Sequence, residues 1–487
     1  AHGARLAGAV TTIEPSAPRA QDADVAIVGA GIAGLTLAHD LARAGLRAIV
    51  CEASDTVGGL LRRGRVGKID LDLGAESFAT RTDAVAALVS DAALDLDLVA
   101  PSPGGAHLAV AGEAGAVVRA PLPRRTVLGI PADPLADDVV ALIGADAAAR
   151  AAAERDLPPL SFGDDDGTEP SLFDLVTERS GRVVAERLVD TLCRSVYSRA
   201  ATDVRLSDLH PGMWAAVREH GSLIAAAEAL ATGARAGAAV GGVSGGMWRL
   251  PAALAEAARA HGADIRTGVA VHAVRADDTI TGGSLLETSA GDVTARVVVV
   301  ATGPAAAARL VSADTEAGDA AAAGRVQVIA AAIDHAGLDA FPAGSGVIVD
   351  PALPTPAKAL THVTAKWAWA RDAAPAHRHL VRLSARGQDA AGLDSREGVA
   401  REVSLLTGVD IAPADVVDVV VQEWPDAVAS PRTAAALAAA PVRIAGASVA
   451  GTGLASVIPH ARALAATLIA ELRTPIRPAS DPLRSHA

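Results

Sequence analysis

The sequence predicts an α/β protein with a parallel sheet of the Rossmann type, an inserted helical domain and a second, mixed sheet. Three observations predict it: a strand, glycine turn and helix near the N-terminus, a similar unit near the C-terminus, and strand patterns between residues 312 and 436. A chain of 487 residues is also too long for one hydrophobic core and should divide into several domains.

The N-terminal glycine motif is the most specific of these signals. The apolar residues 25–28 lead directly into Gly29-Ala-Gly31-Ile-Ala-Gly34 and a helical pattern. The first glycine permits a tight turn, the second lets the backbone approach a pyrophosphate, and the third lets the helix pack against the strand. The phosphates then lie at a helix N-terminus, where free N–H groups favour negative charge. Glu52 follows the next apolar run and can accept from a ribose hydroxyl, so the segment predicts a dinucleotide site.

Later segments favour FAD over NAD. A second glycine pair, Gly58-Gly59, follows the acid closely, as in FAD proteins whose extra backbone amides approach the ribityl chain and the flavin ring. Residues 297–304 predict a buried strand that ends in a turn of small residues. Residues 442–458 predict another strand, glycine turn and helix, whose first N–H groups can stabilise negative charge on a reduced flavin.

Most of the predicted cofactor contacts come from these segments, and the others lie at Arg62, in the loop 74–77 and at Val271. Together they are Gly29, Gly31, Ile32, Ala33, Gly34, Glu52, Ala53, Gly58, Gly59, Arg62, Gly74, Ala75, Glu76, Ser77, Val271, Ala301, Thr302, Gly303, Gly446, Gly453, Val457 and Ile458.

The order of the patterns indicates interleaved domains. We expect flexible tails at 1–22 and 476–487, an FAD-binding domain from 23–81, 240–311 and 437–475, a helical domain at 82–205, and a substrate-binding domain from 206–239 and 312–436.

Composition excludes several function classes. The net charge of −13 argues against nucleic acid as a partner, because nucleic-acid binding needs clustered basic residues. Cys51 and Cys193 cannot build a disulfide framework, which favours a reducing cytoplasm. No run of about 18 apolar residues predicts a membrane-spanning helix, and the histidine spacings predict no metal site. Peripheral membrane contact stays open.

The chain resembles the bacterial FAD-dependent protoporphyrinogen and coproporphyrinogen III oxidases of haem synthesis, which belong to the amine-oxidase flavoprotein superfamily. The resemblance extends from Asp24 to Leu472, and its more specific motifs lie beyond the first glycine turn. They are Gly74-Ala-Glu-Ser77-Phe78, residues 184–197, Gly245-Gly-Met-Trp-Arg-Leu-Pro251, residues 344–349 with Lys366-Trp367, and residues 446–453. Residues 198–201 depart from the acidic stretch of that family, so we expect a loop near the substrate entrance to differ.

The resemblance implies oxidation of coproporphyrinogen III to coproporphyrin III, with O₂ as electron acceptor and H₂O₂ as product. The flavin would carry the hydride chemistry, so no nucleophile or metal is expected. Three alternatives stay open: a protoporphyrinogen IX oxidase, another FAD-dependent amine oxidase or desaturase on the same scaffold, and a non-catalytic paralogue that binds FAD or porphyrin.

Candidate substrate contacts are cations, because the substrate carries several propionates. Arg81 follows the Gly74–Phe78 motif, which resembles a loop that lies beside the flavin in the family, and Arg199 lies in the departing segment 198–201. Lys366 is one of three lysines in the chain. In several relatives of the superfamily a lysine near the flavin positions a water for O₂ chemistry, so Lys366 is a candidate catalytic residue. The alternative role for Lys366 is a salt bridge on the substrate sheet. The oligomeric state, the physiological acceptor and a partner in haem synthesis are not specified by the sequence.

Overall fold

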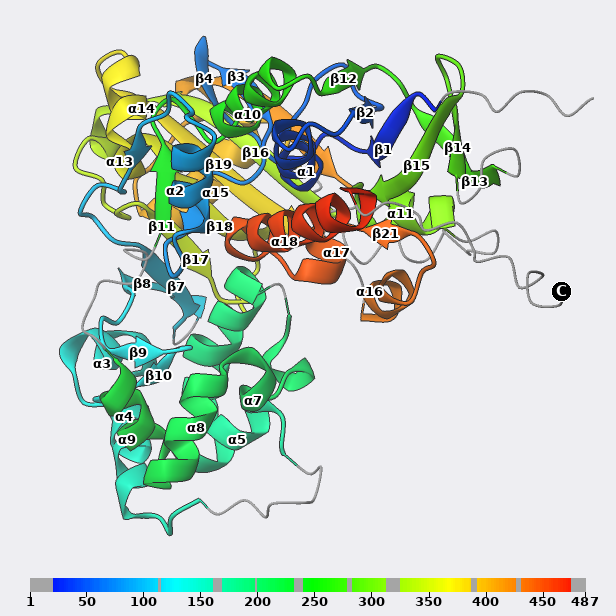
Figure 1. Ribbon diagram of the computed structural model, residues 1–487. Helices are drawn as coiled ribbons and strands as arrows, with labels where there is room; N and C mark the ends of the chain where they lie inside the picture. The colour runs from blue at the N-terminus through cyan, green and yellow to red at the C-terminus, as the bar shows by residue number, and fades with distance from the viewer. Residues whose placement is uncertain are drawn as a thin grey trace, which may run out of the picture.

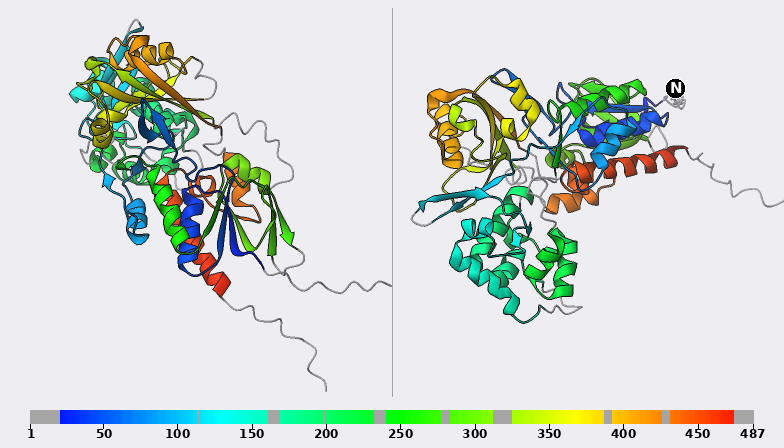
Figure 2. Two further views of the ribbon diagram at one scale, coloured as in Figure 1. Left: turned by 90° about the horizontal axis from the view of Figure 1, so that it is seen from above. Right: turned by 90° about the vertical axis from the view of Figure 1, so that its left-hand side faces the viewer.

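The computed structural model describes residues 21–112, 115–160, 169–197, 199–231, 240–277, 283–311, 325–386, 392–425 and 431–473. Three lobes are visible in Figure 1: one around β1 and α1, one around β16 and β19, and a helical lobe that contains α5 and α8. The right-hand view of Figure 2 separates the same three lobes. The predicted tails lie almost entirely outside the described residues.

The first lobe is built on a seven-stranded sheet in the order β12-β2-β1-β15-β14-β13, with β21 paired to β15. Its strands are β1 (Ala23–Val28), β2 (Ala48–Glu52), β12 (Asp264–Thr267), β13 (Val271–Asp277), β14 (Gly283–Thr288), β15 (Val293–Val300) and β21 (Arg443–Ile444). β1 is parallel to both β2 and β15, and β21 is parallel to β15. The carboxyl ends of these strands therefore meet at one edge, which is where ligands bind in open α/β sheets.

Helices cover both faces of this sheet. Val25 and Ile27 point to one face and pack in a single apolar cluster with α1 (Ile32–Arg43), α10 (Arg249–Ala260) and α18 (Leu454–Arg473). Ala26 and Val28 point to the other face, toward α11 (Pro304–Val311) and α16 (Pro431–Ala438). Burial on both faces explains why these strands are continuously apolar instead of alternating.

The second lobe carries another seven-stranded sheet, in the order β20-β16-β19-β18-β17-β7-β8. Its strands are β7 (His107–Ala111), β8 (Val117–Pro121), β16 (Val326–Asp334), β17 (Gly346–Val349), β18 (Ala357–His362), β19 (Arg378–Arg386) and β20 (Val416–Trp424). One face packs on α15 (Arg396–Thr407). The other face packs on Trp367 and on the hairpin of β3 (Arg63–Val66) and β4 (Ile69–Asp72), which brings the sheet against the first lobe.

The helical lobe has its own apolar core, which includes Leu172, Leu188 and Met213. Its elements are β9 (Thr126–Val127), β10 (Ile130–Pro131), α3 (Asp137–Ile143), α4 (Ala145–Ala152), η2 (Ala153–Asp156), α5 (Leu172–Ser180), α6 (Arg182–Val184), the π-helical turns η3 (Ala185–Asp190) and η4 (Cys193–Tyr197), η5 (Ala201–Asp203), α7 (Leu206–Leu209), α8 (Pro211–His220) and α9 (Leu223–Leu230).

The lobe boundaries differ from the expected ones in two places. β7 and β8 fall within the expected helical domain but complete the second sheet, where β7 pairs with β17. The helices α7 to α9 fall within the expected substrate domain but pack into the core of the helical lobe. The first difference arises because strand pairing joins segments that are distant in sequence, which local patterns do not reveal. The second arises because α7 to α9 pack with the helices that directly precede them in the chain.

The remaining elements are short. They are β5 (Phe78–Ala79), α2 (Ala84–Asp91), β6 (Leu98–Val99), β11 (Val240–Val243), η6 (Ala336–Leu338), α13 (Val363–Lys366), α14 (Ala368–Ala373), η8 (Pro413–Asp415) and α17 (Ala447–Ala450). None of the helices in the described part of the chain combines the length and the apolarity that crossing a membrane requires.

Candidate functional site

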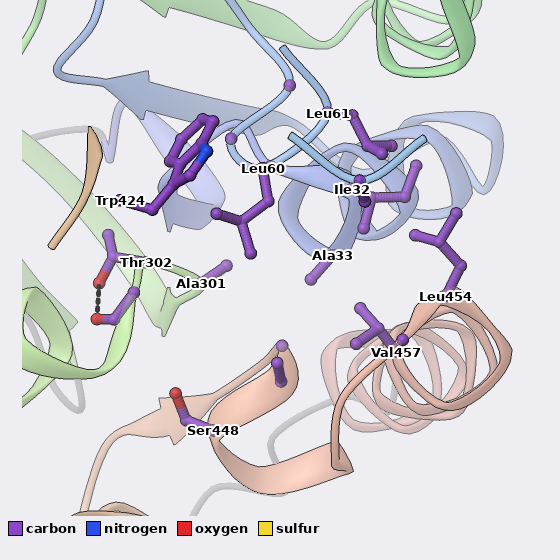
Figure 3. A pocket seen from close by; sticks show the side chains of 18 of the residues that line it. Ile32, Ala33, Leu60, Leu61, Ala301, Thr302, Trp424, Ser448, Leu454 and Val457 are labelled. Atoms are coloured by element: carbon purple, nitrogen blue, oxygen red, sulfur yellow. Dashed lines mark hydrogen bonds between the residues drawn. The ribbon is translucent and has the colours of Figure 1, made fainter. Parts of the chain in front are cut away.

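A cavity of about 320 Å³ lies at the carboxyl ends of β1, β15 and β21 (Figure 3). Its walls come from the turns after these strands, from the second glycine pair, from the 74–77 loop that follows β4, from the end of β20 and from the start of α18. The lining residues are Gly31, Ile32, Ala33, Gly58, Gly59, Leu60, Leu61, Ala75, Ser77, Ala301, Thr302, Gly303, Pro304, Trp424, Gly446, Ala447, Ser448, Gly453, Leu454 and Val457. The wall is mostly apolar, as in many cofactor sites.

The first glycine turn forms one wall of the cavity. Gly29 has a φ of +103°, and a Cβ atom there would lie 2.9 Å from the Ala301 carbonyl oxygen. Gly31 is different, because its φ of −73° and ψ of 178° suit any residue and a Cβ atom there would meet nothing within 4 Å. The protein's own packing therefore does not require a glycine at 31. The open space beside it fits a group that approaches the backbone closely, as the pyrophosphate of a dinucleotide does.

The second glycine pair packs directly on the first turn. The Gly58 N–H donates to the Ala30 carbonyl oxygen at 2.8 Å, and Gly31 and Gly58 form an isolated parallel bridge. Both Gly58 and Gly59 have positive φ angles, of 123° and 57°. This conformation favours glycine and turns the chain across the start of α1.

Glu52 ties the end of β2 to the same turn. Its Oε2 accepts the Ala30 N–H at 2.7 Å, and its Oε1 accepts the N–H and the hydroxyl of Ser54 at 2.9 and 2.5 Å. A carboxylate offers about four acceptor sites, so it retains capacity for a further donor such as a ribose hydroxyl. The Val269 N–H donates to the Glu52 carbonyl oxygen at 2.8 Å. Val271, another of the predicted cofactor contacts, begins β13 and pairs with Thr288.

The structure brings thirteen of the predicted cofactor residues together as cavity lining. The other nine lie outside the lining: Gly29, Gly34, Glu52, Ala53, Arg62, Gly74, Glu76, Val271 and Ile458. Sequence reasoning missed seven lining residues: Leu60, Leu61, Pro304, Trp424, Ala447, Ser448 and Leu454. Five of the seven directly adjoin predicted residues, and Ser448 lies two residues after Gly446. Trp424 comes from the second sheet, so no motif of the first lobe could have indicated it.

A cluster of charged side chains lies next to the cavity, between the 74–77 loop and the second sheet. The Lys366 Nζ is 2.6 Å from Glu76 Oε1, and the Arg382 Nη1 is 3.3 Å from Glu76 Oε2. Burial alone would raise the pKa of Glu76, but the charges of Lys366 and Arg382 hold it below its ordinary value. Lys366 is not among the residues that line the cavity. Lys366 forms a salt bridge with Glu76, and a salt bridge was the alternative role expected for this residue from the sequence.

Asp72, at the end of β4, lies beside this cluster and is almost fully buried. It accepts the backbone N–H groups of Met247 and Trp248 at 2.8 and 2.9 Å. Burial nevertheless raises the pKa of Asp72 to about 6, because desolvation of the charged form outweighs these hydrogen bonds and the attraction of Arg382.

The two predicted substrate arginines lie in different surroundings. The Arg81 Nη2 is 3.5 Å from the Ser456 hydroxyl, and Ser456 precedes the lining residue Val457. Arg81 is exposed, so its guanidinium remains accessible at the start of α18. Arg199 is also exposed, but it donates to the Asp203 carbonyl oxygen at 2.7 Å within the helical lobe.

Comparison with known proteins identifies relatives over most of the chain. Residues 32–462 match the family of flavin-containing amine oxidoreductases. The chain is 32% identical to the coproporphyrinogen III oxidase of Mycobacterium tuberculosis (strain ATCC 25618 / H37Rv) over 414 residues, which are 82% of this chain and 85% of that protein. It is 31% identical to the coproporphyrinogen III oxidase of Mycobacterium leprae (strain TN) over 411 residues, or 82% and 86% of the two chains.

Solved structures show the same fold at lower identity. A protein from Exiguobacterium sp. 255-15, assigned as a protoporphyrinogen oxidase, superposes with a TM-score of 0.76 at 19% identity and covers 93% of this chain and 99% of its own. A putrescine oxidase gives a TM-score of 0.60 at 18% identity, with 92% and 99% covered. The predicted fold class, a Rossmann-type domain with an inserted helical lobe and a mixed second sheet, is confirmed.

Proposed function

The chain belongs to the family of flavin-containing amine oxidoreductases, and from this we propose that it is a porphyrinogen oxidase that converts coproporphyrinogen III to coproporphyrin III with O₂ as acceptor. FAD is the cofactor. The observation that carries the proposal is that relatives named for this one activity match the chain over most of both lengths.

The cavity supports this proposal through its shape and lining. The open space beside Gly31 fits a pyrophosphate, and the turns at Thr302 and Gly446 would surround the rest of the cofactor. Apolar side chains such as Leu60 and Trp424 would exclude water from the reacting atoms. When bound there, FAD supplies the two-electron acceptor for the chemistry.

The chain's own residues would then bind and orient the reactants. The backbone at Gly31 and at the start of α18 would hold the cofactor, because N–H groups at a helix N-terminus favour an anionic partner. Arg81 would contact a propionate of the substrate. The substrate loses six hydrogens in three two-electron oxidations, and each oxidation reduces one O₂ to H₂O₂. No described residue has to act as a nucleophile in this scheme.

The experiment that tests the proposal compares two porphyrinogens. Purified protein with bound flavin is mixed with coproporphyrinogen III or protoporphyrinogen IX in air, and porphyrin fluorescence and H₂O₂ are followed against autoxidation. We expect faster oxidation of the substrate with four propionates and one H₂O₂ for each pair of electrons removed. A flavin that stays oxidised with both substrates in the absence of air would overturn the proposal.

A further inference from the structure

The 74–77 loop separates the cavity from the second sheet. Ala75 and Ser77 line the cavity, whereas Glu76 between them does not. The Glu76 carboxylate instead contacts Lys366 of α13 and Arg382 of β19. One short loop therefore presents two residues to the cofactor space and one buried acid to the neighbouring lobe.

Several hydrogen bonds fix the backbone of this loop. The Trp424 Nε1 donates to the Leu73 carbonyl oxygen at 2.9 Å, and the Arg382 Nη2 donates to the Gly74 carbonyl oxygen at 2.5 Å. The Ala75 N–H donates to the Leu60 carbonyl oxygen at 2.9 Å. The loop is thus bound to the second sheet on one side and to the second glycine pair on the other.

The charges in this arrangement are largely removed from water. The exposed fractions of the side chains are 14% for Glu76, 15% for Lys366 and 6% for Arg382. Within the described residues, Arg382 Nε, Arg382 Nη1 and Glu76 Oε2 have no hydrogen-bond partner, so Arg382 and Glu76 interact here mainly by charge at 3.3 Å. Removing Glu76 would leave two buried cations without their acid, and removing Lys366 would leave Glu76 with Arg382 alone; either change is costly in a buried site.

Four charged groups face one another at this place. Glu76 and Asp72 are contributed by the first lobe, and Lys366 and Arg382 by the second. Asp72 is held by the N–H groups of Met247 and Trp248, whereas Glu76 depends on the two cations for its neutralisation. Lys366 and Arg382 together therefore balance the charge of the carboxylate that stands directly behind the loop.

We propose that Glu76, Lys366 and Arg382 form a positioning cluster that holds the 74–77 loop against FAD and keeps an uncompensated negative charge away from the flavin. The inference rests on the proposed function, which places FAD in the cavity. Lys366 acts through Glu76 and is a positioning residue, not a group that meets O₂. An unneutralised carboxylate behind the loop would oppose the addition of electrons to the flavin, because like charges repel strongly where water is excluded.

The test uses Lys366→Met, Glu76→Gln and the double variant, and measures the midpoint potential of the bound flavin. We expect Lys366→Met to lower the potential, Glu76→Gln to raise it, and the double variant to return close to the wild-type value. A scaffold defect would not move the two single variants in opposite directions. The FAD dissociation constant of Lys366→Met should also rise, by about tenfold, because the 74–77 loop loses the Lys366–Glu76 contact that helps to hold it against the cofactor.

Lys68→Met is the matched control, since Lys68 is exposed in the turn between β3 and β4. It should leave both the potential and FAD affinity unchanged. Lys366→Arg tests rescue, because it keeps the positive charge and should restore the potential. If Lys366→Met does not fold, Glu76→Gln alone must still raise the potential. Shifts in the same direction, or no shift in either single variant, would overturn the inference.

The outcome is separable from that of the proposed function. Opposite shifts in a protein that oxidises neither porphyrinogen would support the positioning cluster and overturn the proposed substrate. Porphyrinogen oxidation without opposite shifts of the flavin potential would support the proposed substrate and overturn the positioning cluster.

Discussion

A Cβ atom on Gly34 would lie 2.0 Å from the carbonyl oxygen of Gly29, whereas a Cβ atom on Gly31 would meet no atom within 4 Å. The two glycines belong to the same turn and the same motif. Gly34 is needed because α1 packs on the turn that precedes it. No packing within the protein requires a glycine at position 31. The space that a side chain at Gly31 would fill is therefore open to a bound molecule.

Gly31→Val should abolish FAD retention while the protein without flavin keeps its thermal stability. Gly34→Val should destabilise the protein whether or not flavin is added, by roughly 1–3 kcal/mol or more, because a side chain would be forced into backbone. Melting temperatures of both flavin-free variants and the flavin content after purification check this. A Gly31→Val protein that copurifies with one FAD per chain would show that the pyrophosphate lies elsewhere.

The first lobe was predictable because its signals are local. The apolar strand at 25–28, the glycine turn and Glu52 all lie within thirty residues, and each has a fixed geometric role. The division into β12 and β13 carried no such signal; the chain breaks between them at Gly268, which has a φ of +69°. Likewise, a helical domain was expected over 82–205, but the sequence pattern could not distinguish α-helix from the π-helical turns η3 and η4.

The partners of Lys366 could not be predicted in the same way. Glu76 lies 290 residues before it, and Arg382 reaches Glu76 from β19, where it lies opposite Thr361 of β18. Neither relationship leaves a periodic or spacing signal in the sequence. Trp424 is similar, since its place in the cavity depends on how the second sheet packs against the 74–77 loop.

The buried pair His362 and His379 should make the protein less stable in acid. The His362 Nε2 is 3.1 Å from the His379 Nδ1, and burial together with the charge of His379 lowers the pKa of His362 to about 3. Below pH 6.5 the unfolded chain therefore binds a proton that the folded chain does not. The contribution of neutral His362 to the free energy of unfolding is complete above pH 6.5. It is lost as the pH falls toward 3, by at most about 1.4 kcal/mol per pH unit.

Denaturant unfolding of the wild type and of His362→Gln between pH 7.5 and 4.5 checks this. Asp339 and His377 also face His379, so the comparison must use the difference between the two proteins. His362→Gln is expected to start from a lower stability and to lose less of it in acid. Parallel pH curves for the two proteins would contradict the prediction.

The contribution of Asp72 to the free energy of unfolding should change with pH in the direction opposite to that of His362. Its pKa is raised to about 6 from 3.8, so the folded chain binds more protons than the unfolded chain between these values. The stabilisation that arises from protonation is complete below about pH 3.8 and disappears as the pH rises through 6. Relative to Asp72→Asn, the wild type should therefore lose up to about 1.4 kcal/mol per pH unit on going from pH 4 to pH 6.

Asp72→Asn should also carry a constant penalty, because an amide offers only one oxygen to the N–H groups of Met247 and Trp248. The pH-dependent part of the difference in unfolding free energy is the relevant measurement. A difference that does not change between pH 4 and pH 7 would mean that Asp72 titrates near its ordinary pKa.

Arg81 is expected to bind a propionate of the substrate, and Arg199 is the matched comparison. Arg81 is exposed beside Ser456 at the start of α18, next to the lining residue Val457, whereas Arg199 is bound to Asp203 in the helical lobe. Arg81→Met should raise KM for coproporphyrinogen III about tenfold with little change in kcat, since a charge-assisted contact made equally before and during the reaction affects binding alone. Arg199→Met should leave both constants unchanged. If Arg199→Met raises KM and Arg81→Met does not, the substrate enters from the helical lobe, and the substrate contact must be reassigned to that side.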